Sequence, residues 1–193
     1  MNTEFLIIFV YSYILGSIPF GLIITKIFLK NDIRTIGSGN IGATNVLRTG
    51  NKFLAILTLL LDVLKGYFSV CLTLVFFNDF IYFSALVCFL GHIYPVWLKF
   101  NGGKGVATYV GVVLALSIEL AIIFILTWLL ILFLFKYSSL SSIISSMIVF
   151  LYSLFTINNN LTLFYFLTFM IILYTHKENI LRLKNKTENK IKL

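Results

Sequence analysis

Seven apolar runs, separated by short polar segments, constrain the fold of this chain more than any other feature. They cover residues 5–28, 53–77, 81–97, 106–117, 120–135, 140–157 and 161–174. A helix needs roughly 20 apolar residues to cross a bilayer, and lipid tolerates no unpaired backbone, so each run is predicted to be helical. With 60% hydrophobic and 11% charged residues, the composition is typical of a multi-span membrane protein. We therefore expect an all-α, polytopic integral membrane protein with about seven transmembrane helices.

The fourth and fifth runs together cover residues 106–135, which is too long for one span. Glu119 interrupts the apolar sequence, so a turn is predicted there between two short helices. The third run is predicted to bend or end at Pro95, because proline cannot donate a helical hydrogen bond. Cys71 and Cys88 lie within apolar runs and are interpreted as core residues.

The distribution of Lys and Arg predicts the orientation, because basic residues favour the cytoplasmic side. With seven spans and the N-terminus outside, each of the 15 Lys and Arg residues except Lys65 falls in a cytoplasmic segment. A five-span arrangement would place Lys136 outside and fits less well. The same distribution explains the net charge of +8 without a nucleic-acid partner. We expect one transmembrane domain at residues 1–176 and a basic cytoplasmic tail at 177–193, with a turn of helix followed by a frayed end.

Four stretches rich in glycine, amide, hydroxyl and basic residues fall on the predicted cytoplasmic side. They are residues 37–50, 62–66, 101–105 and 176–179. Their donors are backbone N–H groups, amides, Lys and Arg, which suit an anion. We therefore expect these stretches to form an anion-binding site.

In the first of these, the first glycine loop, Gly37, Gly39 and Gly42 match the G-x-G-x-x-G pattern. A dinucleotide site is rejected, because that pattern requires a preceding strand and here an apolar helix precedes it. The glycines can still present N–H groups to an anion. The candidate side-chain donors are Ser38, Asn40, Thr44, Asn45 and Arg48. The alternative is an ordinary capped turn with a cytoplasmic Arg.

The second glycine loop, residues 101–105, resembles part of a phosphate loop. It is not a Walker A motif, because Leu98 stands where glycine is required and Gly105 replaces the Ser or Thr that would hold magnesium. Its candidate phosphate-binding residues are Gly102, Gly103, Lys104 and Gly105. The alternative is a flexible interfacial loop in which the lysine extends toward the headgroups.

Three titratable residues lie within or at the ends of apolar runs. Asp62 and Lys65 are three residues apart and share a helix face. Buried charges of this kind are costly and face a polar interior, so the two either pair with each other or orient a glycine loop. His92 is interpreted as a hydrogen-bonded structural residue.

His176 and Asn179 stand at i and i+3 at the cytoplasmic end of the last run. Together they can hold a substrate hydroxyl or phosphate, although a histidine at headgroup level is the alternative. No His-x4-Asp motif, nucleophile elbow or carboxylate cluster for a metal is present in the sequence. Any chemistry must therefore depend on anion binding and positioning.

Taken together, these residues resemble the bacterial acyl-phosphate:glycerol-3-phosphate acyltransferase (PlsY) family. The matching stretches, in the family's order, are GSIPFG at 16–21, GSGNIGATN at 37–45 with Arg48, DVLKG at 62–66, GHIYP at 91–95, NGGKGVAT at 101–108 and HKENI at 176–180. Six motifs in order are highly specific, and the interval 114–174 contributes only hydrophobicity.

The resemblance implies a multi-pass enzyme of the bacterial cytoplasmic (inner) membrane that catalyses the first acylation of phospholipid synthesis. It would transfer a fatty acyl group from acyl phosphate to sn-glycerol 3-phosphate, giving 1-acyl-glycerol 3-phosphate (lysophosphatidic acid) and phosphate, in a site facing the cytoplasm. It implies that Ser38 and Arg48 are essential, that Lys104 and its glycines bind a substrate phosphate, and that His176 and Asn179 complete the site. It implies no cofactor, no metal and no required protein partner.

On this interpretation the four stretches form one pocket for two phosphorylated reactants. Direct attack of the glycerol hydroxyl is expected, because acyl phosphate already carries a good leaving group and positioning can supply most of the rate. His176 is then a positioning residue first and a possible base second. A membrane anion or lipid transporter is the alternative function, although no internal repeat is visible. A non-catalytic scaffold would leave the glycine loops unexplained.

Overall fold

The computed structural model describes residues 3–155 and 159–191, and the regular elements in these residues are all helices. The all-α prediction is confirmed for this part of the chain. Residues 156–157 of the sixth predicted helix and residues 192–193 of the predicted tail lie outside it. The chain divides into two compact units, Met1–Leu116 and Ser117–Leu193, and each is described by itself.

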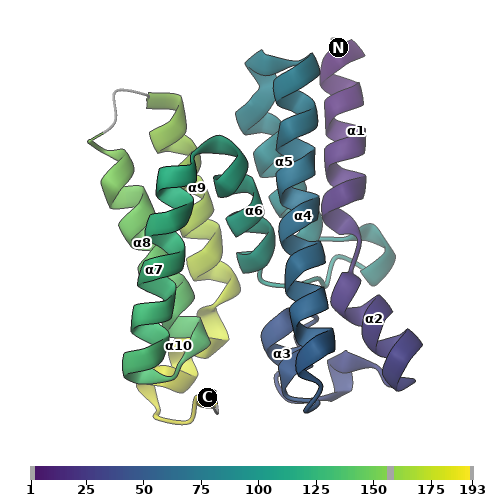
Figure 1. Ribbon diagram of the computed structural model, residues 1–193, viewed down its shortest axis with the longest axis vertical. Coiled ribbons are helices and arrows are strands. Elements are labelled where there is room, and N and C mark those ends of the chain that lie inside the picture. Colours follow the sequence, from purple (N-terminus) through teal and green to yellow (C-terminus); the bar gives the residue numbers. More distant parts are fainter. Residues whose placement is uncertain (1–2, 156–158, 192–193) are drawn as a thin grey trace. The chain divides into compact units, whose positions relative to one another are not determined.

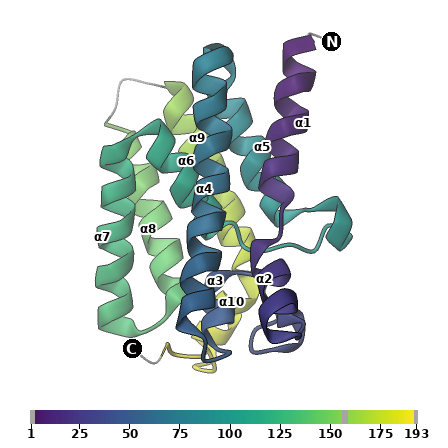
Figure 2. The ribbon, with the colours of Figure 1, turned by 45° about the vertical axis from the view of Figure 1, so that its right-hand side comes forward.

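The first unit is built from helices joined by short polar turns. In chain order its elements are α1 (Thr3–Ser17), α2 (Phe20–Leu29), η1 (Ile33–Thr35), α3 (Ala43–Leu47), α4 (Lys52–Phe76), η2 (Asn78–Phe80), α5 (Ile81–Ile93), η3 (Val96–Leu98) and α6 (Val106–Leu116). α1 packs against α5 and α4 against α6 (Figures 1 and 2). A Cβ atom at Gly16 would lie 2.0 Å from the Cys88 carbonyl oxygen, and one at Gly111 would lie 1.9 Å from that of Val63. Only glycine permits such close helix contacts.

The first predicted helix is interrupted, so the expectation of a single helix across residues 5–28 was wrong. α1 ends at Ser17 and α2 begins at Phe20, leaving at an angle to α1 (Figures 1 and 2). Pro19 has no N–H, and the residue before a proline avoids helical backbone, so the break falls at Ile18 and Pro19. At Pro95 the prediction is confirmed, since α5 ends at Ile93.

A buried apolar cluster supports the first glycine loop. It consists of Leu22, Ile24, Ile33, Ile41, Val46, Leu54 and Ala55, contributed by α2, η1, α3, α4 and the loop itself. The loop is therefore anchored on two helices. α4 begins sharply after the loop, because the side chain of Asn51 accepts a hydrogen bond from the Leu54 N–H at 3.0 Å.

The second unit contains α7 (Ile118–Phe135), α8 (Ser138–Ser153), α9 (Asn159–Thr175) and α10 (Lys177–Lys184). α7 packs against α8, and α8 against α9. The turn before α7 lies at Ser117, two residues earlier than predicted. The Ser117 hydroxyl caps α7 by accepting the Leu120 N–H at 3.3 Å. Glu119 therefore falls in the first helical turn, where a negative charge is favourable.

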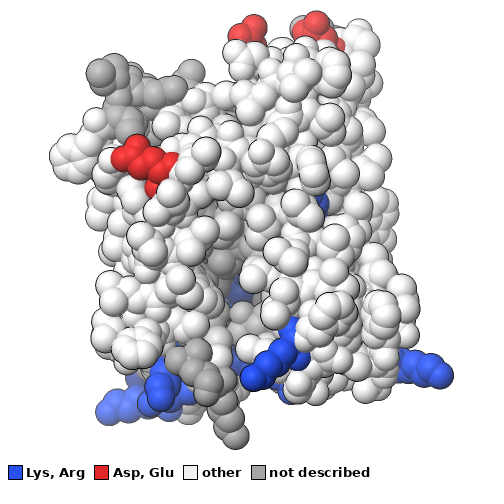
Figure 3. All heavy atoms as spheres, in the orientation of Figure 1, with Lys and Arg blue, Asp and Glu red and all other residues white. Residues whose placement is uncertain are grey.

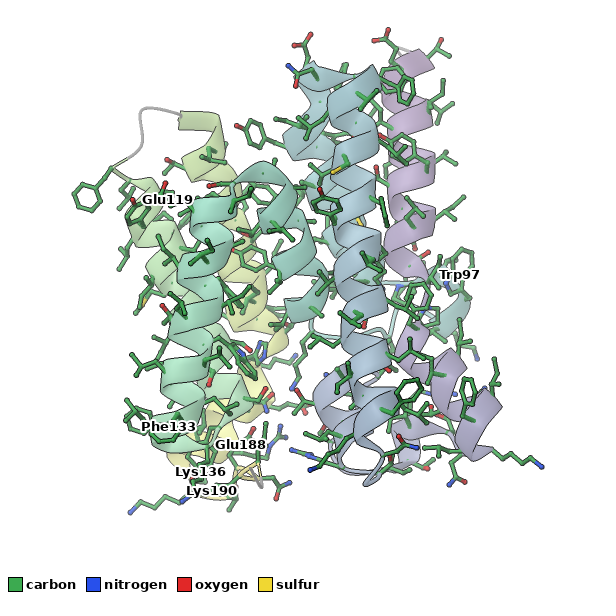
Figure 4. The ribbon with its side chains drawn as sticks, viewed as in Figure 1. Trp97, Glu119, Phe133, Lys136, Glu188 and Lys190 are labelled. Carbon is green, nitrogen blue, oxygen red and sulfur yellow. The ribbon has the colours of Figure 1, made fainter. Side chains whose placement is uncertain are left out.

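The tail folds back onto the rest of the second unit, so the prediction of a frayed end was wrong for the described residues. α10 is the predicted turn of helix. After it, the N–H of Ile191 donates to the Lys136 carbonyl at 2.8 Å, and Glu188 accepts the Ser139 hydroxyl at 2.8 Å. Lys136, Glu188 and Lys190 accordingly lie together at one end of this unit (Figure 4).

Four segments of the described chain are long and apolar enough to cross a membrane, namely Thr3–Leu29, Lys52–Phe76, Asn78–Leu98 and Ile118–Phe135. Three shorter apolar helices cover Val106–Leu116, Ser138–Ser153 and Leu161–Thr175. On the face shown in Figure 3, the basic atoms of each unit gather mainly at one end of that unit, and acidic atoms lie toward its other end. Large apolar side chains are exposed along these helices, as in a protein that contacts lipid.

Candidate active site

The first glycine loop is organised around the buried amide of Asn45. Its Nδ2 group donates to the carbonyl oxygens of Ile33, Ile36 and Asn40 at 2.8 to 3.0 Å. Its Oδ1 accepts the Ser38 N–H at 3.0 Å. The amide was expected to bind substrate, but both of its ends are engaged by the loop backbone. Its place in the site is therefore to hold the loop in shape.

Ser38 and Arg48 are on the exposed surface of this loop. Gly37 lies between them and Asn45 with a φ of +58°, and a Cβ atom there would be 2.5 Å from the Asn45 Oδ1 and 2.8 Å from the Arg48 Cδ. Within the described residues the Arg48 guanidinium has no carboxylate within ion-pair distance. The Ser38 hydroxyl and the Arg48 guanidinium, which has no carboxylate partner among the described residues, are thus both on the exposed surface of the loop.

The other predicted residues of the loop have more local surroundings. The N–H of Gly39 donates to the Ile36 carbonyl at 3.0 Å. Asn40 and Thr44 are half-buried on either side of Gly42, the N-cap residue of α3. The N–H groups of Ser38 and Gly39 are therefore both engaged within the loop.

The loop is preceded by a local ion pair. Asp32 caps η1 by accepting the Arg34 N–H at 3.0 Å, and the two side chains meet at 2.6 Å. Hydrogen bonds from the Arg34 side chain and backbone lower the pKa of the Asp32 carboxyl to about 2. This cap therefore stays charged well into the acid range.

The second glycine loop is packed on the C-terminal end of α5. The Gly102 N–H donates to the Ile93 carbonyl at 2.9 Å, and the Gly103 N–H donates to the His92 carbonyl at 3.1 Å. These two N–H groups cap α5, because a helix end leaves its last carbonyls without partners. Phosphate binding by Gly102 and Gly103 stays a prediction. The backbone here is a support for the neighbouring Lys104.

Close packing leaves room only for glycine at three positions of this loop. A Cβ atom at Gly102 would lie 2.1 Å from the His92 carbonyl oxygen, and one at Gly103 would lie 2.1 Å from the His92 Nε2. A Cβ atom at Gly105 would lie 2.2 Å from the Phe89 ring. Lys104 is half-buried between these glycines, just before the first turn of α6. Its charge is placed where the helix dipole also favours an anion.

Asp62, Lys65 and His92 form a buried cluster. The Lys65 Nζ lies 2.8 Å from the Asp62 Oδ1 and 2.9 Å from the His92 Nδ1. The expectation that Asp62 and Lys65 pair with each other is confirmed by this distance, and His92 is hydrogen-bonded as expected.

In the second unit, His176 is buried at the end of α9. Its Nδ1 lies 2.8 Å from the Ile172 carbonyl oxygen. A carbonyl only accepts, so the Nδ1 donates and a neutral ring keeps its lone pair on Nε2. That is the arrangement required of a residue that accepts a hydrogen bond from a hydroxyl.

Asn179 is held by a residue that the sequence analysis did not identify, Glu188. The Asn179 Nδ2 donates to the Glu188 Oε1 at 2.6 Å, and the Arg182 Nε donates to the Oε2 at 2.7 Å. With the Ser139 hydroxyl, three side chains from α8 and α10 thus meet at one carboxylate. Glu188 was detectable only as an acidic residue within a basic tail.

The charge state of Glu188 follows from these contacts. Burial raises the pKa of its carboxyl, but the hydrogen bonds from Arg182, Asn179 and Ser139 outweigh burial and lower it below the ordinary value for a glutamate. At neutral pH the Glu188 carboxylate that holds the tail in place is therefore ionised.

These arrangements suit the binding of phosphate groups by cations and hydroxyls. Arg48 and Lys104 supply charge, Ser38 supplies a hydroxyl, and His176 with Asn179 supplies neutral polar groups. In the described residues no group of three His, Cys, Asp or Glu side chains is arranged to hold a metal ion. The two units are described separately, so the single shared pocket stays a prediction.

Comparisons with known proteins agree on one class. The sequence profile of the family described as "Glycerol-3-phosphate acyltransferase" matches residues 6–186. A protein of that name from Pelagibacter ubique is 53% identical, with 98% of this chain and 99% of the relative covered. One from Mesorhizobium japonicum is 47% identical, with 99% and 98% covered.

Solved structures give the same result. A crystal structure of PlsY (YgiH), described as an integral membrane glycerol 3-phosphate acyltransferase in its glycerol 3-phosphate form, is 38% identical. The match has a TM-score of 0.93 and covers 98% of this chain and 96% of the other. The lysophosphatidic acid form of that protein matches with a TM-score of 0.90.

Proposed function

The chain belongs to the PlsY family of glycerol-3-phosphate acyltransferases, which makes it a membrane enzyme, and we propose that its acyl donor is acyl phosphate. The acceptor is sn-glycerol 3-phosphate, and the products are 1-acyl-glycerol 3-phosphate and inorganic phosphate. One observation supports the acceptor and the product: the chain matches a crystallised relative along nearly its whole length, in both a glycerol 3-phosphate form and a lysophosphatidic acid form. The donor is the one implied by the six motifs that resemble the family.

The reaction proceeds by direct transfer. The 1-hydroxyl oxygen of glycerol 3-phosphate attacks the acyl carbonyl carbon, a new ester C–O bond forms, and the C–O bond to the phosphate breaks. The hydroxyl proton passes to an oxygen of the departing phosphate. No oxidant, metal or covalent enzyme intermediate is needed to balance this step, so binding and orientation can supply most of the rate.

The candidate residues have complementary roles in this step. Arg48 and Lys104 bind phosphate groups, because each is a cation placed by a rigid loop. Ser38 donates to a phosphate or carbonyl oxygen. His176 and Asn179 orient the acceptor, and the His176 Nε2 accepts a hydrogen bond from the attacking hydroxyl. The acyl chain stays in the bilayer, since the helices expose apolar side chains along their length.

The proposed topology has seven spans, with the N-terminus outside and the catalytic residues facing the cytoplasm of a bacterial inner membrane. It places residues 1–176 in the transmembrane domain and residues 177–193 in a cytoplasmic tail. Thr49→Cys and Lys99→Cys, in a background with Cys71 and Cys88 replaced by Ala, should both react with a thiol reagent from the cytoplasmic side. Labelling of these two positions from opposite sides would contradict the proposal.

The donor is tested with purified enzyme in lipid nanodiscs. Acyl phosphate and glycerol 3-phosphate should give phosphate and lysophosphatidic acid in equal amounts. With acyl-CoA or acylated acyl carrier protein as the donor, no lysophosphatidic acid should form. Activity that requires a thioester donor would overturn the assignment. A transporter would move phosphate across liposomes without forming an ester.

A further inference from the structure

The break between α1 and α2 exposes two carbonyl groups that have lost their helical partners. The Ser17 carbonyl accepts the indole N–H of Trp97 at 2.7 Å, and the Ile18 carbonyl accepts the ammonium group of Lys65 at 2.7 Å. Trp97 is on η3 and Lys65 is on α4, and the label of Trp97 marks the turn beside this junction in Figure 4. The Ile18 carbonyl also accepts the Phe20 N–H at 3.1 Å, so Lys65 is its second donor. In an apolar environment, carbonyls at a helix break need such partners from neighbouring elements.

Lys65 makes two hydrogen bonds and one ion pair at this junction. Its Nζ lies within 2.9 Å of three acceptors, namely the Ile18 carbonyl, the Asp62 Oδ1 and the His92 Nδ1. The side chains of Lys65 and Asp62 are 2% exposed, and that of His92 is 4% exposed. An ammonium group has three donors and no lone pair, so the His92 Nδ1 accepts and the ring proton is on Nε2.

His92 connects this cluster to the second glycine loop. Its Nε2 faces Gly103 so closely that a Cβ atom there would lie 2.1 Å away. Its carbonyl oxygen accepts the Gly103 N–H at 3.1 Å. Both the ring and the backbone of His92 therefore contact the residue that precedes Lys104.

We propose that Lys65 is a positioning residue for Lys104, acting through His92 and Gly103. Lys65 fixes the His92 ring relative to the broken helix, and the ring fixes the course of the loop. A role in packing alone would not require a buried Lys–Asp pair here. Apolar residues of similar volume can replace a buried ion pair at little cost in stability. The inference rests on the proposed function in taking Lys104 as a phosphate ligand.

The test uses the charge-free double variant Asp62→Leu/Lys65→Met, because Lys65→Met alone would leave a buried carboxylate without a partner. The KM for each substrate and kcat are measured with and without Lys104→Ala. The double variant should raise, by about 10-fold, the same KM that Lys104→Ala raises. In the Lys104→Ala background it should add less than about 2-fold, since residues that act through one another are not additive.

Thr73→Val is the matched control. Thr73 is buried on the same helix and bonds to Tyr11, away from the glycine loop. It should leave both KM values unchanged. The inference would be overturned if the KM increases of the double variant and of Lys104→Ala multiplied fully. A folded double variant with wild-type KM values would also overturn it. Either result would leave the proposed function intact. Wild-type KM values for Lys104→Ala alone would instead remove the proposed role of the loop, and the inference with it.

A second pair of variants keeps the test decisive if the double variant does not fold. His92→Gln retains an acceptor for the Lys65 ammonium, whereas His92→Leu removes it. The glutamine variant should keep the affected KM within about 3-fold of wild type, and the leucine variant should raise it about 10-fold, a difference within the range of single contacts. Equal effects of the two variants would contradict a positioning role.

Discussion

The loop at residues 37–48 and the tail at residues 176–191 both carry candidate catalytic side chains, but different chemistry holds them in place. The loop is organised by a neutral amide, Asn45, whose donors and acceptor all bind backbone groups. The tail is organised by an ionised carboxylate, Glu188, which binds three side chains. The conformation of the loop therefore depends on neutral hydrogen bonds to its backbone, and that of the tail depends on the charge of Glu188.

This difference has physical consequences. Removing a buried amide leaves backbone groups without partners, at about 1–3 kcal/mol each. Neutralising a carboxylate weakens charge-assisted bonds but can leave an acceptor in place. The loop should hence be less tolerant of substitution, while the tail should be the part that responds to pH.

The largest effect is expected for Asn45→Leu. Without the amide, the Ser38 N–H and the Asn40 carbonyl lose their partner, and the Ile33 and Ile36 carbonyls keep only their backbone donors. Ser38 and Arg48 should therefore lose their common support. We expect kcat/KM to fall by about 100-fold or more, corresponding to roughly 3 kcal/mol. Asn51→Ala, which removes only the cap of α4, should cost about 1 kcal/mol of stability and little activity. Near-normal activity of Asn45→Leu would reverse the comparison.

A smaller effect is expected for Glu188→Gln. The amide can still accept a hydrogen bond, but the charge that holds Arg182 and Asn179 is lost. We expect kcat/KM to fall by about 10-fold, with faster proteolysis of the tail, since a charged hydrogen bond contributes about 1.5–3 kcal/mol. Glu178→Gln is the matched control, because this carboxylate is 77% exposed and lies 3.6 Å from Arg182. Equal losses in the two variants would show that the tail needs only general negative charge.

The pH response should separate the two regions. Because the pKa of the Glu188 carboxyl is lower in the folded than in the unfolded state, its stabilising contribution is present above the unfolded pKa and is lost as the pH falls through the folded pKa. The protection factors of the α10 amides, which correct for the intrinsic pH dependence of exchange, should therefore fall in the wild type as the pH drops through the folded pKa. Glu188→Gln should show the faster exchange already at neutral pH. The same pH dependence of these protection factors in the wild type and in Glu188→Gln would exclude Glu188 as the titrating group.

The smallest effect is expected from a pair of alanine substitutions. Gly50 has a φ of +86° and open space around it, so Gly50→Ala should cost only the backbone strain of about 1–2 kcal/mol. Gly37→Ala has the same kind of strain and also meets the Asn45 Oδ1 at 2.5 Å. It should lower activity several-fold more than Gly50→Ala, as measured by kcat. Equal activities would mean that the contact with Asn45 does not hold the loop.

Much of the fold could be predicted from local sequence. The apolar runs gave the helices, and Pro95 marked the end of α5, because these signals act within a few residues. The break at Pro19 was missed because hydrophobicity continues through it, and its stabilisation by Lys65 and Trp97 depends on contacts distant in sequence. The start of α7 was misplaced because Glu119 was taken as a turn residue, although Ser117 is the better helix cap.

The site was predicted by residue type more successfully than by role. The glycines of both loops were expected to offer N–H groups to an anion, but those of Gly39, Gly102 and Gly103 bind carbonyls of the protein itself. Sequence composition cannot reveal which donors are already satisfied. Glu188 was missed for a similar reason, since its importance comes from the residues that fold around it.

Single-turnover acyl transfer tests the central claim most directly, namely that residues of both units serve one direct transfer. Wild type, Ser38→Ala and Asn179→Ala are mixed with acyl phosphate, with and without glycerol 3-phosphate, and phosphate, ester and the intact protein mass are measured. We predict that phosphate and ester form together only with acceptor present, that each variant loses both products, and that no protein carries an acyl group. An acylated protein, or phosphate release by Asn179→Ala without ester, would contradict the account.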